Sequence, residues 1–254
     1  MEILAQHDLD NKPYICIPNR IRALSDIIPI MDRLKEFHKE YGVVHIGPFM
    51  DANLRYDIVS YAKTLGLKFS ELGNCDYDVY RHILSQAQWA AVTNSGNADN
   101  ARFAYPNRLF DCVSSVCPIL TYGFVQVSDF VNSQKVGVSI SDINDLSELS
   151  DAVETMSRDR ETFVENLLKT QSDFSWDNTA EDVFKSIPKG AKVLIVSRKD
   201  LRKNIRIRQI CRTLKEKKCE VTVIGGHRID SDLQAKIKTV PFLRMLTIEE
   251  IISL

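Results

Sequence analysis

The feature that most constrains the fold is an alternation of short apolar runs with longer segments of helical period. The apolar runs predict strands at residues 14–17, 43–46, 68–72, 89–93, 118–121 and 136–140. Apolar residues that recur every three or four positions predict helices near residues 25–40, 53–65, 77–86, 105–115, 145–157, 160–170 and 176–187. Strands that alternate with helices of about 10–15 residues are typical of βαβ units. The sequence therefore predicts an α/β, Rossmann-like parallel sheet with helices on both faces.

Charge divides the chain into two unlike pieces. Residues 1–187 contain 17 Lys and Arg against 27 Asp and Glu, whereas residues 188–254 contain 16 against 7. Between them, Pro188-Lys189-Gly190 interrupts the preceding helical pattern. A strand, a helix and a second strand then begin a new βαβ unit within residues 192–224. We therefore expect one complete domain over residues 1–187 and an incomplete βαβ segment over residues 188–254.

Two global features bear on location and cofactors. No stretch approaches the roughly 20 consecutive apolar residues of a membrane span. The N-terminus, MEILAQHDLDNK, lacks the basic start and the apolar core of a signal peptide, so we expect a cytoplasmic protein. The six cysteines include no C-x-x-C pair and have no histidine at a metal-ligand spacing. We therefore expect reduced, buried cysteines and no bound metal.

The stretch between Thr93 and Leu120 is the most informative for function. A predicted strand ends near Thr93, a loop of small polar residues follows, and Pro106 opens a predicted helix. A helix N-terminus at the carboxyl edge of a parallel sheet presents unpaired backbone N–H groups to a phosphate. A carboxylate such as Asp111 can accept hydrogen bonds from the hydroxyls of a ribose. The pattern indicates a nucleotide site, and the alternative is that Asp111 is a solvated helix carboxylate.

This stretch also carries a family resemblance. Residues 106–119, PNRLFDCVSSVCPI, resemble the donor-site signature of group 1 glycosyltransferases with the two-domain GT-B fold, which in many members reads PNKLFEYxAxGxPV. Further stretches match the family in order and spacing: VVHIGP at 43–48, the segments 73–80 and 87–93, and FSW at 174–176. The resemblance covers about residues 12–187. It implies that residues 1–187 are a carboxyl-terminal, nucleotide-sugar-binding domain, and that residues 188–254 are similar to the start of a second glycosyltransferase's acceptor domain.

The resemblance implies a set of donor-binding residues. Asp111 takes the place of the family glutamate that binds the ribose, and Asn107 and Arg108 belong to the same signature. Arg20 follows the opening strand where many relatives carry Gly-Arg, which implies a ligand of the donor diphosphate; a solvated loop charge is the alternative. No catalytic residue is implied, because the base of these enzymes usually comes from the other domain.

The sequence departs from the family pattern at three positions. Val116 replaces a glycine of the signature, Ser25 replaces a lysine that contacts the diphosphate, and Phe103 replaces an acidic residue. A side chain at Val116 stands where the backbone is usually bare, which predicts a narrowed donor pocket or a degenerate site. Ser25 is instead expected, with Asp26, to cap the following helix.

A basic segment opens the second piece. Residues 198–218 contain ten Lys and Arg and two acidic residues. Two interpretations remain open: a solvated helix face, or a face toward anionic lipid carriers or the bilayer, as the resemblance to an acceptor domain implies. The second would place the protein peripherally at the inner face of the membrane. The segment lacks interleaved aromatic residues that could stack on bases, so we expect no nucleic-acid partner.

The resemblance implies transfer of a sugar from a nucleotide-sugar donor to the hydroxyl of a glycan or lipid-linked acceptor, of the hexosyltransferase type, in glycan or polysaccharide assembly. No metal or other cofactor is expected. Because a donor-type domain comes first, an acceptor domain or a second glycosyltransferase is an expected partner, and the chain alone is expected to bind the donor weakly and transfer little. Two alternatives remain open: a non-catalytic, degenerate pairing module held by opposite charges, and a nucleotide-sugar epimerase of the same fold.

Overall fold

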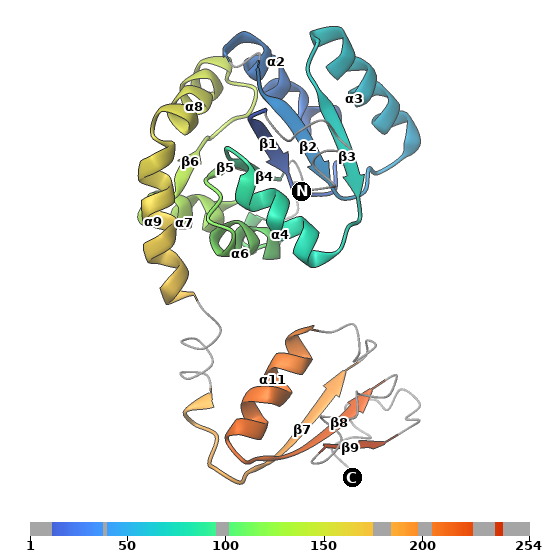
Figure 1. Ribbon diagram of the computed structural model, residues 1–254, viewed down its shortest axis with the longest axis vertical. Coiled ribbons are helices and arrows are strands. Elements are labelled where there is room, and N and C mark those ends of the chain that lie inside the picture. The colour runs from blue at the N-terminus through green and yellow to red at the C-terminus, as the bar shows by residue number, and fades with distance from the viewer. Residues whose placement is uncertain are drawn as a thin grey trace. The chain divides into compact units, whose positions relative to one another are not determined.

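The computed structural model describes residues 12–37, 40–94, 102–174, 184–197, 205–225 and 237–240. Contacts within the chain divide it into two units, Met1–Ser175 and Trp176–Leu254, whose elements are labelled in Figure 1. The sequence placed the boundary later, between residues 187 and 188. The contacts place it earlier because Phe184 and Ile187 belong to the hydrophobic cluster of the second unit.

The first unit is built on one six-stranded sheet in which all neighbouring strands pair in parallel. The strand order is β3-β2-β1-β4-β5-β6, which is the order of doubly wound nucleotide-binding sheets. The predicted Rossmann-like α/β fold is therefore confirmed. The strands are β1 (Tyr14–Ile17), β2 (Gly42–Ile46), β3 (Phe69–Gly73), β4 (Ala90–Thr93), β5 (Ile119–Tyr122) and β6 (Gly137–Ser139).

Helices connect these strands and cover both faces of the sheet, as Figure 1 shows. They are η1 (Leu24–Asp26), α2 (Ile28–Phe37), α3 (Ala52–Leu65), α4 (Tyr77–Gln86), α6 (Asn107–Ser114), α7 (Val125–Gln134), α8 (Leu146–Arg158) and α9 (Arg160–Asp173). Six of the predicted helices occur within a few residues of their expected bounds, and the helix predicted at 176–187 falls mostly outside the described residues. The sequence analysis assigned no element to α7, although its buried residues Val127, Phe130 and Val131 recur at helical spacing.

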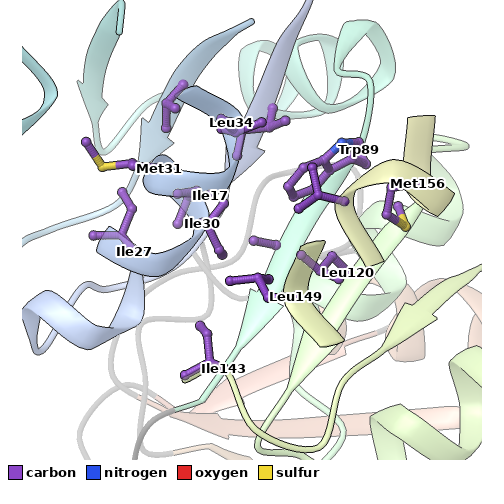
Figure 2. Packing of buried hydrophobic residues seen from close by; sticks show 14 of the residues in the cluster. Ile17, Ile27, Ile30, Met31, Leu34, Trp89, Leu120, Ile143, Leu149 and Met156 are labelled. Carbon is purple, nitrogen blue, oxygen red and sulfur yellow. The ribbon is translucent and has the colours of Figure 1, made fainter. Parts of the chain in front are cut away.

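Side chains of the strands alternate between two hydrophobic clusters, one on each face of the sheet. On β1, Ile15 and Ile17 join the cluster formed with α2, α3 and α8, whereas Tyr14 and Cys16 join the cluster formed with α4, α6 and α7. Burial on both faces explains why the strands are nearly continuous apolar runs in the sequence. Figure 2 shows the first cluster, with Ile17, Ile27, Ile30, Met31, Leu34, Trp89, Leu120, Ile143, Leu149 and Met156 labelled.

The second unit contains a separate parallel sheet of order β7-β8-β9, formed by β7 (Lys192–Ser197), β8 (Glu220–Gly225) and β9 (Ile237–Val240). Helix α11 (Ile205–Glu216) follows β7 and contributes Cys211 and Leu214 to a small core with Val221 and Val223 of β8. The strand, helix and strand predicted within residues 192–224 are therefore present. The likeness of this segment to an acceptor domain stays a prediction.

The predicted membrane contact concerns the basic segment of the second unit. Arg212, Lys215 and Lys218 are exposed, and residues 198–204 lie outside the described residues. Within the part of the chain that the structure describes, no helix is both long and apolar enough to cross a bilayer. Peripheral contact with an anionic surface stays a prediction.

Candidate functional site

The strand order reverses between β1 and β4, so the carboxyl ends of these strands form the switch point of the sheet. Ligands of doubly wound sheets bind in the crevice at this point. A cleft of about 390 Å³ lies there, within the size range of small-molecule sites. It is formed by the ends of β1, β2 and β3 together with α4 and α6, and its lining residues are Pro18, Ile46, Gly47, Gly73, Asn74, Cys75, Tyr80, Pro106, Asn107, Arg108 and Asp111.

Close backbone contacts hold the loops after the first three strands together. The N–H of Gly47 donates to the carbonyl of Gly73 at 2.9 Å, and the N–H of Met50 donates to the carbonyl of Ile21 at 2.9 Å. A Cβ on Gly47 would lie only 2.7 Å from the carbonyl oxygen of Asn19. Gly47 also has a φ of +134°, a conformation that side chains disfavour. The local chain path therefore requires glycine at this position, and it brings two loops together under the cleft.

His45 at the end of β2 fixes the loop that follows β1. The ring is fully buried, and its Nε2 lies 2.8 Å from the carbonyl oxygen of Asn19. Burial lowers the pKa of His45, so the neutral ring donates its Nε2 proton to that carbonyl. Phe49 and Phe69 flank the ring at centroid distances of 4.5 and 6.4 Å. His45 is thus packed and hydrogen-bonded, as its position in a buried strand predicts.

Asn19 connects the two sides of the switch point. It is almost fully buried directly after β1, and its Nδ2 donates to Oγ1 of Thr93 at the end of β4 over 3.4 Å. Its Oδ1 is buried with no hydrogen-bond partner among the described residues. The Asn19 side chain therefore joins the loop after β1 to the end of β4.

Helix α6 brings its first turn to the cleft. Pro106 precedes it in an extended conformation, φ −72° and ψ 146°, and provides no side-chain cap. Proline suits this position because its missing N–H would have no partner there anyway. Asn107 and Arg108 of the first turn both line the cleft. The backbone donors and the positive end of the helix dipole are therefore directed at the cleft wall.

Arg108 joins α6 to the end of β4. Its Nη2 donates to the carbonyl of Thr93 at 2.6 Å, and its guanidinium carbon lies 5.4 Å from the centroid of the Phe124 ring. Burial lowers the pKa of Arg108, although the group remains a cation at neutral pH. Arg108 therefore holds the helix in place and at the same time supplies positive charge to the cleft.

Asp111 lies one turn further along α6 and also lines the cleft. Its Oδ1 accepts a hydrogen bond from the Tyr77 hydroxyl at 2.9 Å. Burial, reinforced by the charge of Asp111, raises the pKa of Tyr77 to about 12. The pKa of Tyr80 is also raised, mainly by burial, with further contributions from the charge of Asp111 and a hydrogen bond to it. Both phenols are therefore protonated at neutral pH and can donate to the carboxylate.

The structure brings together three of the four predicted donor-binding residues. Asn107, Arg108 and Asp111 line one cleft, whereas Arg20 follows β1 with an exposed side chain and is not part of the lining. The predicted polar loop before Pro106 lies largely at residues 95–101, outside the described residues.

Sequence reasoning did not single out Tyr77 and Tyr80, although both contact Asp111. The sequence feature that could have pointed to them is their spacing, because residues three apart in a helix lie on the same face. Nothing in the sequence placed that face of α4 against α6, which is a matter of tertiary packing.

Val116 does not narrow the cleft. It has a φ of +54° and follows the C-terminus of α6, at the opposite end of the helix from Asn107. The N–H of Cys117 donates to the carbonyl of Cys112 at 2.9 Å, and the N–H of Val116 donates to the carbonyl of Val113 at 3.1 Å. These are the two hydrogen bonds of a Schellman motif. The glycine of the family signature therefore corresponds to a helix-ending position here, and the expected intrusion of a side chain into the donor pocket was wrong.

Ser25 does not provide the predicted helix cap. It lies within η1 with an exposed side chain. Asp26 is buried instead, and its Oδ2 accepts hydrogen bonds from the backbone N–H groups of Arg22 at 2.7 Å and Ala23 at 3.0 Å. The carboxylate rather than the hydroxyl therefore fixes the chain before α2.

Three D-x-D triplets occur in the sequence, a spacing at which carboxylates can share a divalent cation. Asp76-Tyr77-Asp78 lies at the start of α4 with both carboxylates exposed, whereas the triplets at residues 8–10 and 230–232 lie outside the described residues. Among the described side chains, no group of three or more His, Cys, Asp or Glu is arranged to hold a metal ion. Metal independence stays a prediction.

Comparison with solved structures identifies the fold. HepE of Anabaena, solved with UDP, superposes with a TM-score of 0.60 and 13% identity over 73% of this chain and 51% of that chain. Sucrose-phosphate synthase of Thermosynechococcus elongatus superposes with a TM-score of 0.56 and 14% identity, over 72% of this chain and 47% of that chain. The C-terminal domain of a group 1 glycosyltransferase, LpcC of Francisella tularensis, superposes with a TM-score of 0.53 and 13% identity, over 67% of this chain and 93% of that chain. No protein-family model and no curated protein sequence matches the chain.

The LpcC match decides which half of these enzymes the chain resembles. The second unit makes up less than a third of the chain, so a match over 67% of the chain must include more than half of the first unit. The first unit has the fold of a GT-B carboxyl-terminal domain. The predicted resemblance is thus confirmed at the level of fold, which is what an identity of 12–14% can show. The chain spans about half the length of HepE and of sucrose-phosphate synthase.

Proposed function

We propose that the first unit binds a nucleotide sugar and serves a glycosyltransferase that transfers the sugar to an acceptor hydroxyl. One observation carries the proposal: Asp111 and the first turn of α6 line a single cleft at the switch point of a GT-B-type sheet. HepE, which has this fold, has been crystallised with UDP and with UDP-glucose. The cleft volume of about 390 Å³ is compatible with a ligand of this class.

Each cleft residue has a role that follows from its chemistry. The backbone donors at Asn107 and Arg108 and the helix dipole would face the diphosphate. The guanidinium of Arg108 would add a fixed positive charge. The carboxylate of Asp111 would accept the ribose hydroxyls. Arg20, exposed at the same edge of the sheet, is proposed to reach the diphosphate from the solvent side.

In the chemical step, this unit would stabilise the negative charge that develops on the leaving diphosphate, and it would not supply a reactive side chain. The acceptor oxygen forms a bond to the anomeric carbon while the bond from that carbon to the diphosphate breaks. The acceptor proton goes to a base, and the electron pair leaves with the nucleoside diphosphate. Donors already fixed at the leaving oxygen lower the barrier because they do not have to reorganise. The base and the acceptor site are proposed to come from an acceptor domain that partners this unit.

The remaining parts of the proposal concern context. A glycan or lipid-linked acceptor, hexosyl transfer and a role in polysaccharide assembly follow from the resemblance of residues 106–119 alone. The basic segment of the second unit would allow peripheral contact with anionic lipid at the cytoplasmic face of a membrane. The chain alone is proposed to bind donor without efficient transfer. Neither a metal nor another cofactor is proposed.

Neither alternative function gains support from the cleft. The pairing module rested partly on Val116 filling the donor pocket, and Val116 lies outside it. An epimerase of this fold would need both acidic and histidine catalytic residues facing the cleft. The cleft lining contains no histidine, and nearby His45 is buried and engaged by Asn19.

Calorimetric titration of the purified chain with UDP, GDP, ADP and UDP-glucose tests the proposal. We expect saturable binding of one nucleotide series, weakened at least about tenfold by Asp111→Ala, since hydrogen bonds to a charged group are involved. Asp129→Ala is a matched control, because Asp129 is an exposed helical carboxylate on α7 that does not line the cleft. Absence of binding to every nucleotide, or equal losses in the two variants, would refute a donor site here.

A further inference from the structure

Asp111 does not stand alone in the cleft. Tyr77, at the first position of α4, donates its hydroxyl to Oδ1 of Asp111 at 2.9 Å. The two helices are also joined near the other end of α6, where Nη2 of Arg81 donates to the carbonyl of Ser114 at 3.0 Å. Since the start of α4 is held against α6 by these bonds, the Tyr77 hydroxyl has a fixed position relative to the carboxylate.

Tyr77 and Tyr80 approach the same carboxylate from different sides. They lie three residues apart on one face of α4, with ring centroids 6.1 Å apart. Tyr80 lines the cleft, whereas Tyr77 does not and is 47% exposed. Tyr77 therefore reaches Asp111 from outside the cleft, and a ligand in the cleft does not have to displace it.

A carboxylate has room for both partners. Its two oxygens offer about four acceptor positions, so donation by Tyr77 to Oδ1 leaves positions for the hydroxyls of a ligand. A carboxylate on a short, single-bonded stem can rotate, and binding must otherwise immobilise it. The family glutamate is one methylene longer, so the aspartate of this chain cannot reach as far and its orientation matters more.

We propose that Tyr77 is a positioning residue: its hydroxyl fixes the carboxylate of Asp111 so that the remaining acceptor positions meet the 2′- and 3′-hydroxyls of the nucleotide. This rests on the proposed function, because it assumes that a ribose lies at Asp111. Tyr80 supports the same orientation from within the cleft. The high pKa of Tyr77, about 12, keeps the donor protonated throughout the neutral range.

The test compares a nucleoside diphosphate with its 2′,3′-dideoxy counterpart, using whichever of UDP, GDP and ADP binds the wild-type chain. Tyr77→Phe removes one oxygen atom and keeps the ring. We expect it to weaken binding of the ribonucleotide about 3- to 10-fold, the size of one hydrogen bond. Binding of the dideoxy nucleotide should change less than about 2-fold, because no ribose hydroxyl is there to be oriented. In the Asp111→Ala background, Tyr77→Phe should have no further effect.

A control variant and a stability measurement separate a positioning role of Tyr77 from an effect on folding. Tyr56→Phe alters a tyrosine that is 71% exposed on α3 and does not line the cleft, so it should leave both affinities unchanged. Tyr80→Phe is a second variant, expected to weaken ribonucleotide binding in the same selective way. Thermal unfolding of each variant checks that the first unit remains folded.

The outcomes distinguish the two proposals. Wild-type binding that is sensitive to Asp111→Ala but insensitive to Tyr77→Phe would overturn the positioning role alone. Equal losses for the ribonucleotide and its dideoxy counterpart would also overturn it, since they would reflect a general structural defect. A wild-type chain that binds no nucleoside diphosphate would overturn the proposed function, and this inference with it.

Discussion

Val116 ends α6 in a conformation that glycine adopts far more readily than valine. Its φ of +54° lies in the left-handed region, and the two hydrogen bonds of the Schellman motif enclose it. A β-branched residue in this region is a genuine outlier. The perturbation that isolates this strain is the pair Val116→Gly and Val116→Ala, because both variants lack the two γ-methyl groups and differ only in the Cβ.

The expected difference follows from two opposing contributions. The left-handed conformation costs a residue with a Cβ about 1–2 kcal/mol. Glycine avoids this strain but loses about 0.5–1 kcal/mol more in backbone entropy when it folds. Val116→Gly should therefore be more stable than Val116→Ala by about 0.5–1 kcal/mol, equivalent to a few degrees in Tm at most for a unit of this size.

At a control position inside a helix, the difference in stability between the glycine and alanine variants should have the opposite sign. Glu154 is exposed on α8, within an ordinary helix, where alanine is more stable than glycine by about 1 kcal/mol. Urea unfolding can be followed by the fluorescence of Trp89, which is fully buried in the first unit. A Trp176→Phe background assigns the signal to Trp89, since the chain contains two tryptophans.

Two results would refute the reasoning. If Val116→Ala proved more stable than Val116→Gly, Val116 could not have the left-handed conformation. If Val116→Gly changed nucleotide affinity, the claim that Val116 lies away from the cleft would be wrong, because the eight residues of α6 place about 12 Å between its two ends.

Two further predictions concern His45 and Cys75. Burial lowers the pKa of His45, so its neutral form is favoured in the folded state. The contribution of His45 to the unfolding free energy should therefore be fully present above the unfolded pKa of about 6.5 and be lost as the pH falls below it. His45→Gln keeps a donor for the carbonyl of Asn19, and urea unfolding should show a smaller loss of stability from about pH 7.5 to about pH 5.5 than in the wild type; an equal loss would contradict this assignment. Cys75 is half-buried in the cleft wall, whereas the other five cysteines are buried, so a maleimide should label Cys75 first, as mass spectrometry can show. Bound nucleotide should slow this labelling and Cys75→Ser should abolish the fast phase; a rate insensitive to nucleotide would argue against ligand binding in this cleft.

Much of the fold follows from periodicity alone. The runs that became β1 to β6 are buried on both faces, so they are apolar throughout, and only parallel sheets covered on both sides need such strands. The helices show their apolar residues at helical spacing, and α7 does so with Val127, Phe130 and Val131. No element was predicted over residues 125–134, although the helical spacing is present there.

The residues of the candidate site also fall into those that the sequence could predict and those that it could not. Asp111, Asn107 and Arg108 could be predicted because they lie in one continuous stretch whose position after a strand follows from the pattern. Tyr77 could not, since it is 34 residues away and meets Asp111 only through the packing of α4 on α6. Arg20 was placed by analogy with relatives, and an exposed loop side chain has no packing that would direct it into the cleft.

The sequence by itself determined the class of the fold, the alternation of strands and helices, and the residues that begin α6. Local spacing suffices for these because each depends on neighbours a few positions apart. Only the tertiary structure decided the strand order that creates the switch point, the position of Val116 outside the cleft lining, and the hydrogen bond that joins Tyr77 to Asp111. These depend on contacts between segments far apart in the chain, which no local pattern encodes.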